Sequence, residues 1–221
     1  MPIAIITNPM GMGKTLLITL YSLLASILFN DFTIYANFHL NLKNAVYNPS
    51  MFFPIKNMKR NTLILIDDIY TMRNLDSFLS LLVNWSRKLG ITVLITAQRT
   101  IGMVDKTIRF VSDYLVKPKV YKNVGIVVFD ILELKTGKVY RKYCKNVFFY
   151  SNLIYDTNEV VKFVSERQYI KEIVKFSDDI DDLHDNLELY TKNRALRKKI
   201  FKEIIENNPK FLINTINKKG V

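Results

Sequence analysis

Short apolar runs alternate with longer amphipathic segments along the first half of the chain. The apolar runs are rich in β-branched residues and predict buried strands at residues 3–7, 33–37, 62–68 and 91–96. One helix is predicted after the first run, ending near Phe29. A second is predicted over residues 75–88, where apolar side chains recur every three or four positions and Gly90 follows as a helix terminator. This alternation is typical of an α/β fold whose mostly parallel sheet is flanked by helices.

The pattern changes in the second half. Residues 111–116 are a further strand candidate, and the runs 124–134 and 138–144 flank Lys135-Thr136-Gly137, which predicts a β-hairpin. From Asn158 onward the pattern is helical. We therefore predict two parts, an α/β core with its hairpin over residues 1–160 and a helical C-terminal extension over residues 161–221.

Composition and charge limit the classes of function that this chain can have. The single cysteine, Cys144, excludes an intramolecular disulfide framework, and two distant histidines argue against a Cys/His zinc site, so we interpret Cys144 as a plain strand residue. The net charge is +12, and a surplus of +11 lies before Ser151. A basic body of this kind predicts a polyanionic partner. The alternative is a lysine-rich surface that serves solubility.

No targeting or membrane segment is expected. The N-terminus has no basic region before its apolar run. The longest apolar stretch, Leu16–Phe29, has polar interruptions and is shorter than the roughly 20 residues that a membrane-spanning helix needs. We interpret it as a buried helix.

The stretch NPMGMGKT, between the first strand and the first helix, predicts a phosphate-binding loop for ATP. Gly11 and Gly13 allow backbone N–H groups to approach phosphate oxygens at a helix N-terminus. In this motif Lys14 reaches the β- and γ-phosphates, and the Thr15 hydroxyl is a ligand of Mg²⁺. Asn8 stands where the pattern usually has glycine, and asparagine tolerates a left-handed backbone. The residues predicted to contact the nucleotide are Asn8, Pro9, Met10, Gly11, Met12, Gly13, Lys14 and Thr15.

Two further strands deliver polar residues to the same edge of the predicted sheet. The apolar run at 62–66 ends in Asp67, which we expect to hold Mg²⁺ through water, and Asp68, which we expect to orient the attacking water. Asp68 stands where many motor ATPases have glutamate, and either carboxylate could instead be a helix cap. Gln98 follows the strand at 91–96 and is placed to report hydrolysis.

Arg87 is a candidate arginine finger, a residue that reaches the nucleotide of a neighbouring subunit and raises its hydrolysis rate roughly 10³- to 10⁵-fold. The alternative is that Arg87 and Lys88 only match the dipole at a helix C-terminus. The weaker finger candidates are Arg99, Arg73 and Lys88.

The order of these segments resembles the HerA/FtsK superfamily of P-loop ATPases, and within it the genome-packaging ATPases of archaeal turreted icosahedral viruses and of poxvirus type. The most specific part is the arrangement of Arg87, Gly90 and Gln98 around the strand that precedes the glutamine. The segments at 111–122 and 155–159 and the hairpin between them resemble the parts that follow the core in these proteins. The likeness covers about the first 160 residues.

The resemblance implies a RecA-like core, a homo-oligomeric ring, often a hexamer, and Mg²⁺-dependent ATP hydrolysis that moves double-stranded DNA without regard to sequence. Matched position by position, the functional residues are Lys14 and Thr15 in the phosphate loop, Asp67 and Asp68 in the second motif, Gln98 as sensor and Arg87 as finger. Clustering suggests Lys117, Lys119 and Lys122 as DNA contacts, although solvated lysines are the commoner explanation.

The function expected from these observations is packaging of a viral genome in the host cytoplasm, with the virion as a second location and capsid or virion membrane proteins as further partners. An extrusion or conjugation ATPase of the same superfamily is an alternative, as is a nucleotide-binding switch or scaffold that does not translocate. A GTPase is disfavoured because no NKxD stretch occurs, and a nucleotide kinase because no arginine-bearing lid follows Gln98.

Overall fold

The computed structural model describes residues 2–29, 31–51, 61–69, 86, 88–98, 106–156 and 165–219. These residues form a sheet with the strand order β3-β2-β4-β5-β1-β6-β7-β8. The strands are β1 (Ile3–Asn8), β2 (Thr33–Ala36), β3 (Ala45–Tyr47), β4 (Thr62–Ile66), β5 (Ile91–Gln98), β6 (Tyr114–Tyr121), β7 (Ile126–Glu133) and β8 (Val139–Cys144). All neighbours from β3 to β6 are parallel, whereas β7 pairs antiparallel with both β6 and β8.

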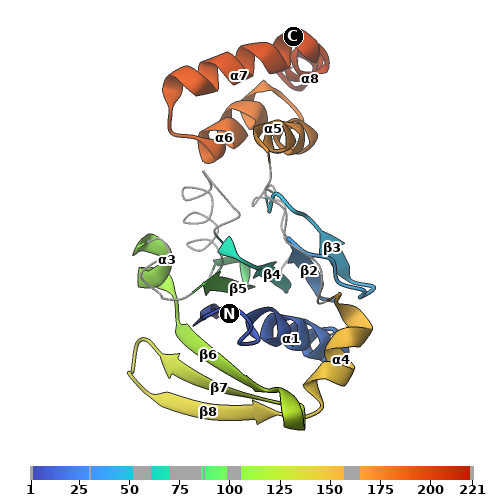
Figure 1. Cartoon of the computed structure of the whole chain (residues 1–221). Coiled ribbons are helices and arrows are strands. Elements are labelled where there is room, and N and C mark those ends of the chain that lie inside the picture. The colour runs from blue at the N-terminus through green and yellow to red at the C-terminus, as the bar shows by residue number, and fades with distance from the viewer. Residues whose placement is uncertain are drawn as a thin grey trace.

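Helices lie on both sides of this sheet, and the antiparallel strands β6–β8 curve beneath α1 (Figure 1). The helices are α1 (Lys14–Leu28), α3 (Lys106–Val111), α4 (Val147–Ile154), α5 (Glu166–Lys175), α6 (Ile180–Tyr190), α7 (Arg194–Asn207) and α8 (Lys210–Lys219), and a short 3₁₀ helix, η4 (Lys122–Val124), follows β6. Helix α4 packs against α1.

The central strands are apolar on both faces because both faces are covered. On the α1 side, Ala4 and Ile6 of β1 pack with Leu63, Leu65 and Ile18. On the opposite side, the alternate residues of the same strands belong to a second cluster. It continues into the buried side chains of α5–α8, which include Tyr169, Ile173, Leu183, Leu187, Ile200, Ile204 and Phe211.

Capping residues explain where the C-terminal helices begin. The side chains of Ser165, Asp179 and Asn193 accept hydrogen bonds from backbone N–H groups in the first turns of α5, α6 and α7. Asp179 belongs to an acidic cluster at 178–185, so one of those acids has a structural role. Among the described residues no helix is long and apolar enough to cross a bilayer.

The α/β fold with a mostly parallel sheet, a hairpin and a helical C-terminal segment is confirmed. The strand expected at 111–116 is wrong in its first half, because α3 extends to Val111 and β6 starts at Tyr114. Side-chain bonds favour this break: the Ser112 hydroxyl donates to Ile108 O, and the Asp113 carboxylate accepts the Ile3 N–H. The short strand β3 and helix α4 were not expected. The helix expected at 75–88 falls largely outside the described residues.

Candidate nucleotide site

The loop between β1 and α1 has the geometry of an anion-binding site. Gly11 and Gly13 have positive φ angles of 76° and 83°, and Gly13 is the N-cap of α1. The first turn of α1 carries no acidic residue, and its N-cap offers no side chain to the free N–H groups. Because these N–H groups and the helix dipole attract anions, the loop fits a phosphate.

Lys14 lies folded back over this loop. Its Nζ donates to the Asn8 carbonyl at 2.8 Å and to the Pro9 carbonyl at 3.0 Å. Partial burial lowers the pKa of Lys14, while the negative charges of Asp67 and Asp68 act against that shift. The ammonium group therefore stands between the loop backbone and the two carboxylates that the sequence predicted.

The Asp67 carboxylate accepts hydrogen bonds from two hydroxyl groups. The Thr15 hydroxyl donates to Asp67 Oδ2 at 2.9 Å, and the Thr96 hydroxyl donates to Asp67 Oδ1 at 2.5 Å. Asp67 is 7% exposed, and its burial raises the pKa of the carboxyl, although both hydroxyl groups and the charge of Lys14 oppose that rise. An ionised carboxylate at this depth calls for a cation.

The residues present fit Mg²⁺ held together with phosphates. Thr15 and Asp67 bring two oxygen ligands side by side, which is the type of donor Mg²⁺ prefers. Within the described residues no group of three His, Cys, Asp or Glu side chains could hold a metal by itself. Magnesium commonly binds through one or two protein oxygens plus substrate phosphates, so the loop and Asp67 would share the ion.

Asp68 and Gln98 contact each other across adjacent parallel strands. Gln98 Nε2 donates to Asp68 Oδ2 at 2.8 Å, and the Asp68 N–H donates to the Thr96 hydroxyl at 2.8 Å. Asp68 has a φ of 48°, a left-handed conformation that aspartate tolerates better than most residues. The glutamine therefore fixes the orientation of a carboxylate that follows directly after β4.

Two residues of this network were missed in the sequence. Thr96 joins Asp67 to Asp68 as described above. Asn37, which is buried, pairs with the backbone of Asp67: its Nδ2 donates to Asp67 O and its Oδ1 accepts the Asp67 N–H, both at 2.8 Å. Their one available signal was a polar side chain at or just beyond the carboxyl end of an apolar strand, the same feature that identified Asp67.

Asn8 differs from its expected role. It is the last residue of β1 and does not have a positive φ, so left-handed tolerance does not explain it. Instead its Nδ2 donates to Pro118 O of β6 at 2.5 Å. Of the remaining loop residues, Met10 and Met12 are exposed. The finger candidates Arg87, Arg73 and Arg99 lie outside the described residues, and Lys88 is exposed.

No family model matches this chain, and no curated protein matches it. Among solved structures, it is similar to the N-terminal domain of zonular occludens toxin from Neisseria meningitidis, with 13% identity and a TM-score of 0.50 over 67% of this chain and 97% of that one. The genome packaging NTPase of Sulfolobus turreted icosahedral virus 2 gives 11% identity and a TM-score of 0.46, over 63% and 94% of the two chains.

The RadB recombinase gives 14% identity and a TM-score of 0.47 over 71% of this chain and 91% of that one. At these identities the likeness concerns the fold alone. The likeness to the zonular occludens toxin domain extends to an α/β fold with a mostly parallel sheet, as the sequence predicted.

Proposed function

We propose that this protein is a Mg²⁺-dependent ATPase that moves double-stranded DNA. The observation that carries the proposal is the convergence of three parallel strands on one site. The phosphate loop after β1, the Asp67–Asp68 pair after β4 and the Thr96–Gln98 end of β5 are joined by hydrogen bonds. Ligands of parallel α/β sheets bind at this carboxyl edge.

Each residue of the site has a separate role in the transfer of a phosphoryl group to water. The backbone N–H groups at the N-terminus of α1 and the Lys14 ammonium would hold and neutralise the phosphates, and Thr15 and Asp67 would hold Mg²⁺. When bound, Mg²⁺ supplies charge neutralisation on the phosphate oxygens. Asp68, held by Gln98, accepts a hydrogen bond from the attacking water and orients it in line with the bond that breaks. Gln98 then senses the loss of the terminal phosphate through Asp68.

Arg87 completes the site of the neighbouring subunit in a ring, which we take to be a hexamer. The resemblance in sequence to the HerA/FtsK superfamily supports this assignment, and with it the packaging of a viral genome together with capsid or virion membrane proteins. The excess of +12 charges supports a DNA partner, because phosphate contacts from lysine and arginine give affinity without reading sequence.

The test is the steady-state ATPase rate, with and without long double-stranded DNA. Lys14→Ala should abolish turnover, Arg87→Ala should lower it roughly 10³-fold or more, and Arg167→Ala, which removes an exposed arginine from α5, should leave it unchanged. Mixtures of wild type and Arg87→Ala should lose activity non-linearly, since each mutant subunit disables a neighbour. DNA-independent hydrolysis together with wild-type behaviour of Arg87→Ala would leave a nucleotide switch rather than a ring motor.

A further inference from the structure

Positive charge is concentrated in the antiparallel strands β6–β8 and in the segments that adjoin them. Residues 114–145, which contain β6, β7 and β8, include eight lysines and arginines but only two acidic residues. Their surplus of +6 is half the net charge of the whole chain. This part of the sheet therefore differs in charge from the apolar parallel strands beside the loop between β1 and α1, which we call the nucleotide loop.

The strand register places three of these charges, Lys117, Lys119 and Arg141, on one face, whereas Lys142 lies on the other face and the remaining four lie outside the strands. Because side chains alternate along a strand, Lys117, Lys119 and Tyr121 lie on one face of β6, and Pro118 and Val120 on the other. The pairing of β6 with β7 and of β7 with β8 aligns further residues with that first face. We call it the outer face of β6–β8, and its polar and aromatic residues are Lys117, Lys119, Tyr121, Asp130, Arg141 and Tyr143.

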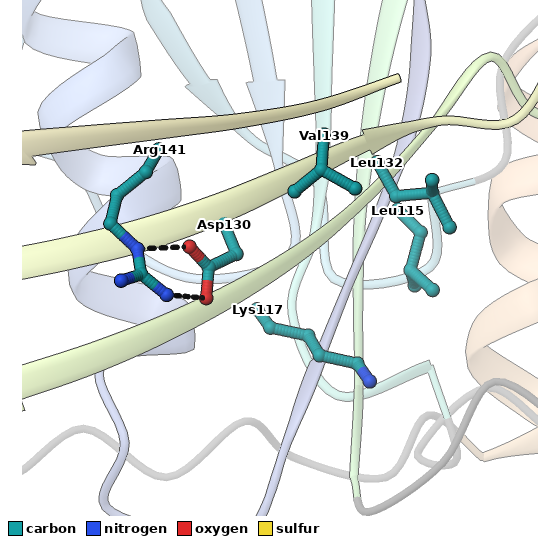
Figure 2. A pocket seen from close by; sticks show the side chains of 6 residues that line it. All are labelled: Leu115, Lys117, Asp130, Leu132, Val139 and Arg141. Carbon is teal, nitrogen blue, oxygen red and sulfur yellow. Dashed lines mark hydrogen bonds and ion pairs between the residues drawn. The ribbon is translucent and has the colours of Figure 1, made fainter. Parts of the chain in front are cut away.

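The one acidic side chain on this face is neutralised by a neighbour. Arg141 Nε donates to Asp130 Oδ1 at 2.7 Å and Arg141 Nη2 to Oδ2 at 3.1 Å, a two-pronged pair that lowers the pKa of Asp130 (Figure 2). Lys117 lies beside this pair without a bond to it, at the edge of an open depression of about 480 Å³. Within the described part of the chain, neither Lys117 nor Lys119 forms an ion pair, so both ammonium groups remain available to an anion.

Exposed tyrosines hold two of the surrounding ammonium groups at the surface. Lys119 Nζ lies 5.2 Å from the ring centre of Tyr121, and Lys145 Nζ lies 5.9 Å from that of Tyr143. Both rings are exposed, at 44% and 67%. Cation–π contacts of this kind orient an ammonium group without neutralising it. The phenol hydroxyls add donors that also suit phosphate oxygens.

We propose that the outer face of β6–β8 binds the phosphate backbone of double-stranded DNA, an inference that rests on the proposed function. The face is an open sheet surface, and its contacts are ammonium and phenol groups rather than an element shaped for a groove. Such contacts hold phosphates without reading bases.

Strand β6 also contacts the loop between β1 and α1, through the backbone carbonyl of Pro118 and through the side chain of Val120 on its opposite face. Pro118 accepts the side-chain hydrogen bond of Asn8, and Val120 lies so near Gly13 that a Cβ there would collide with its Cγ2. DNA bound to Lys117 and Lys119 therefore acts on a strand whose intervening residues brace the loop. This arrangement links DNA binding directly to the rate of hydrolysis.

The experiment compares two double variants that each lose two positive charges. Lys117→Ala with Lys119→Ala removes the outer-face lysines, whereas Lys198→Ala with Lys199→Ala removes two exposed lysines from α7 as a matched control. Binding of a fluorescent DNA duplex of arbitrary sequence is measured by anisotropy over a range of salt concentrations. ATPase rates with and without that duplex and thermal melting of each variant complete the set.

We expect the outer-face variant to bind the duplex roughly tenfold more weakly at moderate salt, with a log–log salt slope shallower by about 2, since each lost phosphate contact removes ~0.9. It should also lose most of the DNA stimulation of hydrolysis while melting like the wild type. The α7 variant should resemble the wild type in binding and stimulation.

Equal binding by the two double variants would overturn the inference, and a wild type that hydrolyses ATP and is stimulated by DNA would then leave the proposed function standing. A wild type that hydrolyses ATP without binding duplex would overturn both the outer-face assignment and DNA movement. Absence of hydrolysis in the wild type, with duplex binding lost only in the outer-face variant, would support the surface and reject the ATPase.

Discussion

The charge of the Asp67 carboxylate is costly to the fold because the group is buried. Its burial raises its pKa, and the hydroxyl donors Thr15 and Thr96 offset that rise only in part. A raised pKa in the folded state means that the ionised carboxylate destabilises the fold relative to the unfolded chain. A buried charge of this kind is tolerated at a binding site because the ligand supplies what the protein lacks.

Asp67→Asn should therefore raise the stability of the ligand-free protein at neutral pH while abolishing hydrolysis. The carboxamide keeps the site filled, accepts from Thr96 and donates to the Thr15 oxygen, and it carries no charge. The gain over wild type should be full above the raised pKa of Asp67. It should vanish as pH falls toward about 3.8, the ordinary aspartate value, because both forms are then neutral.

Urea unfolding of wild type and Asp67→Asn at a series of pH values measures this difference directly, since groups common to both proteins cancel. A gap of constant size from neutral to acidic pH would contradict the assignment of the effect to the carboxylate charge. A less stable Asp67→Asn at neutral pH would show that its hydrogen bonds outweigh its desolvation.

Thr96 and Thr19 make a matched pair of buried hydroxyl groups. The Thr96 hydroxyl binds both Asp67 and the Asp68 N–H, so Thr96→Val should lower the free energy of unfolding by about 1–3 kcal/mol. In the described structure the Thr19 hydroxyl, buried in α1, has no hydrogen-bond partner. Thr19→Val should raise stability by about 1 kcal/mol, since it removes an unsatisfied group at nearly equal volume and helix propensity.

Urea midpoints of the two valine variants provide the measurement, and their difference in sign is the decisive result. Losses of equal size would mean that the two substitutions act through packing alone. The ATPase rate adds a second readout, because Thr96→Val should lower turnover through the displaced Asp68 while Thr19→Val should not.

The chemistry-bearing residues of the site were predictable to the extent that a motif fixes their spacing. Lys14 and Thr15 follow from the glycine-containing loop motif, and Asp67 and Gln98 follow from polar residues at the end of an apolar strand. Asn37 also follows an apolar strand, but that position does not predict its role, which is to pair with a peptide group of another strand. Whether it lies beside Asp67 depends on the pairing of β2 with β4, which is a property of the whole sheet.

At the scale of elements, the nucleotide loop packs directly against β6. Gly11 and Gly13 share a positive φ but differ in surroundings: a Cβ at Gly11 meets open space, whereas one at Gly13 collides with Val120. The two glycines therefore separate backbone strain from packing against β6.

Gly11→Ala should destabilise the protein by about 1–2 kcal/mol, the penalty of a left-handed alanine. Gly13→Ala should carry that penalty plus about 1–3 kcal/mol for overpacking. Adding Val120→Ala to Gly13→Ala should recover only the second part, which a double-mutant cycle on urea unfolding would measure. Additive effects of Gly13→Ala and Val120→Ala would show that β6 does not brace the loop.

Elements buried on both faces were predicted well, and elements set by distant partners were not. Strands β1, β4 and β5 are continuous apolar runs, and such a run by itself predicts a strand that is buried on both faces. Helix α4 was missed because it presents exposed Phe149, Tyr150 and Leu153 to solvent and gives no clean amphipathic period. Its short length and its packing on α1 come from the tertiary structure.

At the scale of the whole molecule, the C-terminal helices and the sheet share a buried cluster. Phe211 of α8 is fully buried and belongs to the same cluster as Ile3 and Ile5 of β1. A sequence boundary near residue 160 therefore does not imply independent unfolding. Regions that share buried apolar surface tend to open together.

Phe211→Ala should lower the free energy of unfolding by about 3–5 kcal/mol, because it leaves a cavity in that shared cluster. The single tryptophan, Trp85, belongs by sequence to the predicted core over residues 1–160 and not to the C-terminal extension, so its fluorescence provides a signal from the first of the two parts. If the two parts unfold as one, the Trp85 transition and the far-ultraviolet circular dichroism should shift together to lower urea concentration.

The control is Ile213→Ala, at a 58% exposed position of the same helix, which should shift neither transition by much. A Trp85 transition that stays in place while the helical signal melts early would mean that residues 161–221 unfold separately, and the extension would then be an appendage to the ATPase core rather than part of its support.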